Sequence, residues 1–235
     1  MATDPGGNGP GFSERFDRAL RVAALVHRGQ PRKGTCLPYL MHPVHVAAIL
    51  ARHGYREPVQ IAAVLHDTIE DLGEGDEASL SDLLATFRRE LGDGPATRDA
   101  LRPRLEAFLG QAFGPEALTL VRAVTEEKHD AYGRPLPWGV RKAATLSRLS
   151  DPGLPVAAVA LKAADVVHNA QSIRRDLQEL GPSAMERFSG TPEDTLAFYR
   201  GVVKLVGARV GAGHPLAREV HAAVEALAAC LETGR

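Results

Sequence analysis

Residues 59–71 read VQIAAVLHDTIED, an apolar helical segment that ends in a run of ionisable side chains. On a helix, His66 and Glu70 would share one face, and Asp67 and Asp71 would lie on the adjoining face. Burying unpaired carboxylates is strongly unfavourable. The run therefore predicts full solvation, basic partners or a bound divalent cation at this helix end.

Composition narrows the class of protein around this run. The chain has 235 residues, of which 44% are hydrophobic, and a formal net charge of −1. These values predict a sizeable core and argue against a general binder of nucleic acids or acidic membranes. Cys36 and Cys230 lie far apart without a CxxC spacing, so we expect free thiols in a reducing cytoplasm. No stretch of the sequence reaches the ~18 uncharged apolar residues of a membrane span.

Helical periodicity, with prolines near helix starts, predicts an all-α fold. We expect a compact multi-helix bundle in a single domain over residues 12–235, after a disordered Gly- and Pro-rich tail over residues 1–11. Residues 72–113 have a weaker pattern and are interpreted as a peripheral insertion with two helices. The other expected helices cover residues 13–29, 42–54, 57–71, 115–125, 138–149, 155–177, 192–210 and 215–231.

Two histidines and two aspartates on three separate expected helices form a candidate ligand set. His42 opens one helix, His66 and Asp67 lie together on the next, and Asp165 lies in a later one. Two imidazoles and two carboxylates suit a borderline or hard divalent ion such as Mn²⁺, and not a structural thiolate zinc site. Each residue alone is weak evidence, because a histidine near a helix start is more often a cap or a partly exposed side chain. The set requires the three helices to converge.

With these motifs, the chain resembles HD-domain phosphohydrolases. Within that family it is most similar to the hydrolase domain of the RelA/SpoT alarmone enzymes and to the stand-alone small alarmone hydrolases of the animal type. The resemblance covers about residues 16–174, and the HDxxED run is its most specific part. The matching blocks are 27–33 (HRGQPRK) with 38–39 (PY) and 42–43 (HP), 66–71 (HDTIED), 125–128 (TEEK) and 162–172 (KAADVVHNAQS). We expect a hydrolase without the synthetase domain of the long enzymes.

The resemblance implies removal of the 3′-pyrophosphate from (p)ppGpp, which leaves GDP or GTP and pyrophosphate. Glu70 and Asp71 match the acidic pair that orients or activates the attacking water. The residues that match ligands of one metal ion, usually Mn²⁺, are His42, His66, Asp67 and Asp165. The residues that match substrate-binding positions are Arg32, Lys33, Lys128, Lys162, Asn169 and Ser172. Without the family match, Arg32 and Lys33 would be interpreted as solvated loop cations.

Two departures from the family leave the substrate open. Gln171 stands where the long enzymes often have arginine, and the insertion 72–113 could cover the pocket or form an oligomer contact. One alternative is an HD phosphohydrolase that acts on another nucleotide, (p)ppApp or NADPH. Another is a non-catalytic nucleotide-sensing or antitoxin-like module. We expect a small-molecule nucleotide as partner, no nucleic acid and no membrane, while a homo-oligomer stays open. Tyr199 is interpreted either as a residue of the hydrophobic core or as a residue that reaches the active site.

Overall fold

The computed structural model describes residues 13–72, 77–94 and 98–233. The all-α prediction is confirmed, because the described residues hold no extended pairing beyond two isolated bridges. The expected tail over residues 1–11 lies outside the described residues. The helices are α1 (Glu14–Val26), α2 (Met41–Arg52), α3 (Glu57–Leu65), α4 (Glu77–Leu91), α5 (Arg98–Val124), α6 (Trp138–Ser150), α7 (Val156–Leu180), α8 (Pro192–Val206) and α9 (Pro215–Thr233). A short 3₁₀ turn (Pro182–Met185) and a π-helical turn (Gly207–Gly211) flank α8.

Side-chain caps explain where two of these helices begin. The Ser13 hydroxyl oxygen accepts a hydrogen bond from the Phe16 N–H at 3.2 Å before α1. The Thr191 hydroxyl oxygen accepts one from the Asp194 N–H at 3.1 Å before α8. Both satisfy backbone donors that the first turn of a helix leaves free. None of the described helices is long and apolar enough to cross a lipid bilayer.

The HDTIED run does not lie on α3, contrary to the sequence prediction. α3 ends at Leu65, and residues 66–72 form consecutive turns. The His66 Nδ1–H donates to the Ala63 carbonyl at 2.7 Å, and the Thr68 hydroxyl donates to the Leu65 carbonyl at 2.6 Å. These bonds engage carbonyl oxygens that a longer helix would use for its own N–H groups. The acidic side chains therefore spread around a turn instead of stacking along one helix face.

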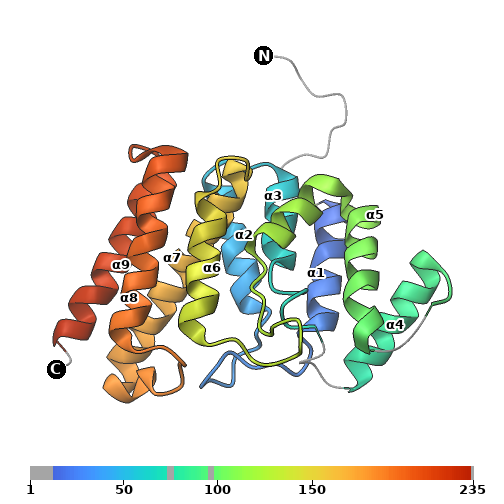
Figure 1. Ribbon diagram of the computed structural model, residues 1–235, viewed down its shortest axis with the longest axis horizontal. Coiled ribbons are helices and arrows are strands. Elements are labelled where there is room, and N and C mark those ends of the chain that lie inside the picture. The colour runs from blue at the N-terminus through green and yellow to red at the C-terminus, as the bar shows by residue number, and fades with distance from the viewer. Residues whose placement is uncertain (1–12, 73–76, 95–97, 234–235) are drawn as a thin grey trace, which may run out of the picture.

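α7 is the central helix of the bundle and packs against α2, α5, α8 and α9 (Figure 1). Most of its side chains between Ala158 and Ala170 are buried, and many of them are alanines. Small side chains at a helix contact let the two axes approach closely. The packing of α2 against α7 brings His42 next to Asp165, and so it assembles the candidate ligand set.

α4 and the part of α5 before Gly114 lie at one edge of the bundle, where Figure 1 shows α4 outermost. Their aromatic side chains nevertheless belong to the common core, since Phe87, Phe108 and Phe113 are all buried. The ring of Phe108 lies 5.7 Å from that of Phe87 and 6.1 Å from that of Phe113, measured between centroids. Burying one phenylalanine stabilises a fold by about 1.5–3 kcal/mol. The segment expected as an insertion therefore contributes directly to the core.

A kink at Gly114 divides α5 into two helical parts. The φ angle of Gly114 is 85°, in the left-handed region that only glycine adopts readily. Pro115 follows and starts the second part, where its fixed φ suits a first turn. The two helices that we expected on either side of this position are therefore both found.

Candidate active site

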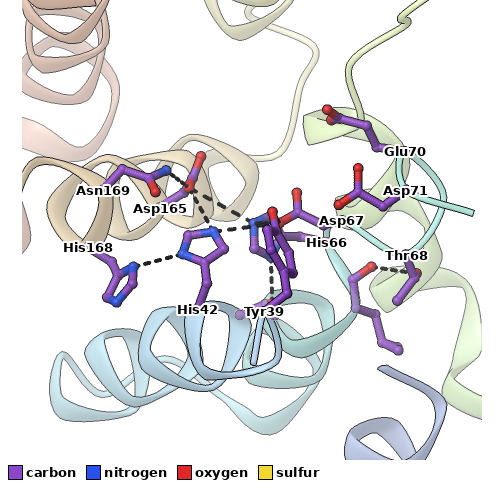
Figure 2. Close-up of polar contacts among 12 residues, drawn as sticks. Tyr39, His42, His66, Asp67, Thr68, Glu70, Asp71, Asp165, His168 and Asn169 are labelled. Atoms are coloured by element: carbon purple, nitrogen blue, oxygen red, sulfur yellow. Dashed lines mark hydrogen bonds and ion pairs between the residues drawn. The ribbon is translucent and has the colours of Figure 1, made fainter. Parts of the chain in front are cut away.

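Three of the four predicted metal ligands converge from two helix ends. His42 lies in the first turn of α2, and His66 and Asp67 follow the last turn of α3. One nitrogen or oxygen atom from each lies within 4.8 Å of the other two. The distance to Asp67 Oδ2 is 3.1 Å from His66 Nε2 and 3.6 Å from His42 Nε2. Figure 2 shows the two imidazoles and this carboxylate turned toward one another.

Asp165 of α7 completes the predicted set. Its Oδ1 lies 3.2 Å from His42 Nε2 and 4.0 Å from His66 Nε2. Its other oxygen, Oδ2, accepts a hydrogen bond from Lys162 Nζ at 2.9 Å. Burial alone would raise the pKa of Asp165, but the charge of Lys162 and the histidines hold it well below the usual range. Asp165 is therefore ionised in the buried centre.

The hydrogen bonds and the pKa of His66 indicate whether these residues fit a metal ion. Its Nδ1–H donates to the Ala63 carbonyl, which leaves Nε2 with a free lone pair in the neutral ring. Although Asp67 Oδ2 is 3.1 Å away, the buried Nε2 forms no hydrogen bond with any described residue. Burial lowers the pKa of His66, but Asp67 and Asp165 outweigh it and raise the pKa to about 9. The centre thus attracts positive charge at Nε2, and the donor set fits a divalent ion.

A chain of three histidines runs from the centre to the surface. His42 Nδ1 lies 2.8 Å from His168 Nδ1, and His168 Nε2 lies 3.0 Å from His45 Nδ1. Burial and the neighbouring His42 lower the pKa of His168 to about 3, so its ring is neutral and carries one N–H. A His42 ring with a free Nε2 then donates from Nδ1 to His168, which donates in turn to His45. Such a partner orients a ligating imidazole and fixes its tautomer.

Tyr39 and Asn169 hold the two aspartates of the centre in place. The Tyr39 hydroxyl donates to Asp67 Oδ2 at 2.7 Å, and Asn169 Nδ2 donates to Asp165 Oδ1 at 2.6 Å. Arg32 Nη2 donates to Asn169 Oδ1 at 2.9 Å, and its guanidinium lies 5.5 Å from the Tyr39 ring centroid. Arg32 thereby contacts the two residues that hold the carboxylates of Asp67 and Asp165. Sequence reasoning gave Tyr39 no role, because no spacing pattern relates it to Asp67.

Glu70 and Asp71 lie beside the ligands, on the side of Asp67 away from His42 (Figure 2). Lys128 Nζ donates to Asp71 Oδ1 at 2.7 Å, and Gln30 Nε2 donates to Asp71 Oδ2 at 3.0 Å. Glu70 Oε2 instead accepts a hydrogen bond from a backbone N–H, at 3.1 Å. Burial, reinforced by neighbouring carboxylates, raises the pKa of Glu70 to about 7. Near neutral pH, Glu70 can therefore both take up and release a proton.

Five of the six predicted substrate-binding residues line two cavities at this centre. The predicted residues around a cavity of about 240 Å³ are Lys33, Lys162 and Asn169, with Glu70 and Asp165 on its wall. Those around a cavity of about 210 Å³ are Arg32, Lys33, Asn169 and Ser172. Lys128 is bonded to Asp71 and belongs to neither lining.

Several residues at these cavities were missed or left open by the sequence. Glu126, Arg141 and Lys142 line the 240 Å³ cavity, although we singled out none of them as site residues. Tyr199 is buried and lines the same cavity, so it belongs both to the core and to the site wall. Gln171 lines neither cavity but lines a groove of about 670 Å³, whose lining also includes His42 and, in common with the 210 Å³ cavity, Arg32 and Ser172.

Comparisons with known sequences agree with this geometry. The sequence model for the HD domain matches residues 19–92. A GTP pyrophosphokinase of Streptomyces coelicolor is 43% identical over 79 residues, which make up 34% of this chain and 8% of that protein. The guanosine-3′,5′-bis(diphosphate) 3′-pyrophosphohydrolase of Aquifex aeolicus is 45% identical over 62 residues, 26% of this chain and 9% of that protein. The chain therefore spans less than a tenth of either relative.

One solved structure matches over most of the chain. It belongs to a metazoan orthologue of SpoT that is described as hydrolysing ppGpp. The match has a TM-score of 0.59 and 25% sequence identity, and it covers 92% of this chain and 97% of that one. Residues 19–92 are therefore similar to HD domains, and the resemblance to RelA/SpoT-type hydrolases that the motifs indicated is confirmed.

Proposed function

We propose that the chain is a metal-dependent phosphohydrolase that removes the 3′-pyrophosphate of (p)ppGpp. The products are GDP or GTP and pyrophosphate. The observation that carries the proposal is the buried Nε2 of His66, which has no hydrogen bond with a described residue and faces a second imidazole and two carboxylates. The metazoan structure and the Aquifex relative, whose descriptions refer to this chemistry, support the substrate class.

In this proposal the predicted set His42, His66, Asp67 and Asp165 holds one ion. Its mixture of imidazole and carboxylate donors favours Mn²⁺. When bound, such an ion polarises a phosphoryl oxygen and makes water more acidic. The protein supplies the orientation of the donors through Tyr39, Asn169 and the His168 ring.

Glu70 is the proposed proton acceptor. It lines the cavity where a phosphoryl group would lie, and its pKa, raised by burial to about 7, suits proton transfer near neutral pH. The oxygen of the attacking water forms a bond to the 3′ phosphorus, and one of its protons passes to Glu70. The bond from phosphorus to the ribose 3′-oxygen breaks, its electron pair stays on that oxygen, and the oxygen takes up a proton from solvent to become the 3′-hydroxyl. Asp71 has a different task, because its bonds to Lys128 and Gln30 make it a positioning residue.

The remaining proposed contacts are those of the substrate. Arg32, Lys33, Lys128 and Lys162 supply positive charge to the phosphates, since guanidinium and ammonium groups form charge-assisted hydrogen bonds with phosphate oxygens. Asn169 and Ser172 line the 210 Å³ cavity and are the proposed polar contacts of the nucleoside.

We also propose that the HD-type unit extends over residues 12–235 and works in the cytoplasm on a small-molecule nucleotide. Cys36 is an exposed free cysteine, which agrees with a reducing compartment. A light-scattering measurement of molar mass in solution would decide whether the enzyme forms a homo-oligomer.

The first test is turnover by purified, metal-stripped protein. Substrates are ppGpp, ppApp, NADPH and GTP, each with and without added Mn²⁺, and products are separated by chromatography. We expect GDP and pyrophosphate from ppGpp only when the ion is present. Turnover of ppApp or NADPH alone would redirect the assignment to another nucleotide. No turnover of any substrate with the ion bound would favour a non-catalytic binding module instead.

A further inference from the structure

An ionic cluster outside the predicted site lines the 240 Å³ cavity. The side chain of Glu126, which is 8% exposed, is paired with Arg141 Nη1 at 2.5 Å and with Lys142 Nζ at 2.7 Å. The two cationic side chains are themselves mostly buried, with 18% and 25% of their surface exposed. One carboxylate thus serves two cations, which leaves the cluster with a surplus positive charge. Because a buried charge requires a partner, this surplus points to an anion that enters the cavity.

The surplus charge borders the proposed reaction centre. Glu70 and Asp165 line the same cavity, and the Glu126 N–H donates to Glu70 Oε2 at 3.1 Å. The chain has only five lysines, and four of them gather here. Those that line the cavity are Lys33, Lys142 and Lys162, and Lys128 is bonded to the adjacent Asp71. Lysines that serve solubility would be spread over the surface, whereas this concentration is typical of a phosphate site.

Arg141 and Lys142 retain donors for a ligand. A guanidinium offers five N–H donors and an ammonium offers three. Glu126 engages one nitrogen of each side chain. The Lys142 ammonium also lies 5.7 Å from the Trp138 ring centroid and 5.1 Å from that of Phe198. These aromatic faces hold it in place without using its hydrogen bonds.

We propose that Arg141 and Lys142, positioned by Glu126, form a second anion site that binds the diphosphate of the nucleotide that is not hydrolysed. For (p)ppGpp this is the 5′-diphosphate or 5′-triphosphate. The identity of the substrate rests on the proposed function, whereas the presence of an anion site does not. Two anchors, one at the ligand set and one at this cluster, would select nucleotides that carry phosphate groups at both ends of the ribose.

Trp138 offers a direct readout, because it is the only tryptophan of the chain and lines the cavity. Metal-stripped protein is titrated with inorganic pyrophosphate while tryptophan fluorescence is recorded. We expect a saturable change, with affinity reduced about tenfold or more in Arg141→Gln, because a charge-assisted hydrogen bond is lost. Lys142→Met keeps the apolar stem on the aromatic rings and removes only the charge, so it should fold normally and show the same loss. Lys204→Met, at an exposed position of α8, is the matched control.

Equal affinity in wild type, Arg141→Gln and Lys142→Met would overturn the anion site, as would the absence of any saturable response in the wild type. A loss of affinity in Lys204→Met as large as in Lys142→Met would also overturn it, since the effect would then be general charge. Circular dichroism and thermal melting of each variant separate loss of binding from loss of folding.

A kinetic comparison connects the cluster to the substrate. Guanosine 3′-diphosphate, which lacks the 5′ group, should be hydrolysed by the wild type with a kcat/KM at least about tenfold below that of ppGpp. In Lys142→Met this preference should shrink, mainly through a higher KM for ppGpp. An unchanged preference would refute the assignment to the 5′ group. If no nucleotide is hydrolysed but pyrophosphate binding depends on Arg141 and Lys142, the proposed function fails and the anion site stands.

Discussion

Metal binding should release about one proton from His66 near neutral pH. Burial opposes protonation of this ring, but Asp67 and Asp165 raise its pKa to about 9, so the metal-free protein carries imidazolium at pH 7. The proton must leave Nε2 before an ion can bind there. Each pKa unit corresponds to about 1.36 kcal/mol, so two units weaken the apparent affinity at pH 7 by about a hundredfold relative to pH above 9. Between pH 6.5 and 8, the dissociation constant should fall about tenfold per unit.

The other three ligands should add no proton to this count. Burial lowers the pKa of His42 despite its contacts with Asp165, so its ring is already neutral. The pKa of Asp67 is lowered as well, because the charge of His66 outweighs the effect of burial. The pKa of Asp165 also lies well below its usual range. Among the four ligands, His66 alone therefore contributes to the expected pH dependence.

Calorimetric titration of Mn²⁺ in two buffers of different ionisation enthalpy measures the number of protons released. Thermal melting gives an independent signal, because an ion present at 100 times its dissociation constant stabilises the native state by about 2.7 kcal/mol. For a chain of this size, that corresponds to a rise in Tm of roughly 5–11 °C. His221→Gln is the control, because His221 is exposed and distant in sequence from every ligand. Tight binding with a proton count near zero would refute the reasoning about His66.

Three further perturbations test the ligands, the proton acceptor and the core. Asp67→Ala should abolish both Mn²⁺ binding and activity while the helical circular dichroism stays nearly unchanged; retention of either would remove Asp67 from the ligand set. Glu70→Gln should keep the ion and lose on the order of a hundredfold in kcat. The wild-type rate should fall as the pH drops below about 7, because burial raises the pKa of Glu70 to about 7 and the basic carboxylate predominates only above that pH. A bound cation nearby would shift this fall in rate to lower pH. If Glu70→Gln shows the same fall in rate, the assignment of Glu70 is contradicted. Phe108→Ala should lower the free energy of unfolding, measured by urea unfolding, by about 3–5 kcal/mol if α4 and α5 are part of the core. Leu180→Ala, at an exposed position, should change it little, and equal effects would contradict the packing described.

Local signals were sufficient to predict the helices and the types of residue in the centre. Pro192 and Pro215 are the first residues of α8 and α9, where the sequence predicted those helices to begin. The convergence of His42, His66 and Asp67 follows from motif chemistry, because few arrangements satisfy so many buried ionisable groups. The end of α3 was harder, since the apolar pattern continues to Ile69 and only the side-chain bonds of His66 and Thr68 decide where the helix stops.

Contacts between helices that are far apart in the chain could not be predicted from the sequence. His42 and His168 are 126 positions apart, and their contact depends on how α2 crosses α7. Glu126 read only as one acidic residue in a mixed block, and its two partners on α6 are defined by tertiary packing. Periodicity reports which face of a helix is buried, but it does not identify the residue on the opposite side of the contact.

The late position of α7 in the chain has a consequence for the order of folding. Asp165 and His168 follow His66 by about a hundred residues, which take roughly 5–20 s to synthesise at typical rates. Through that interval, α2 and α3 exist without the helix that supplies Asp165 and the imidazole behind His42. We therefore expect the ion to stabilise the finished bundle and not to guide its first stages. A nascent chain that stops before α7 should fail to retain the metal even where its early helices have formed.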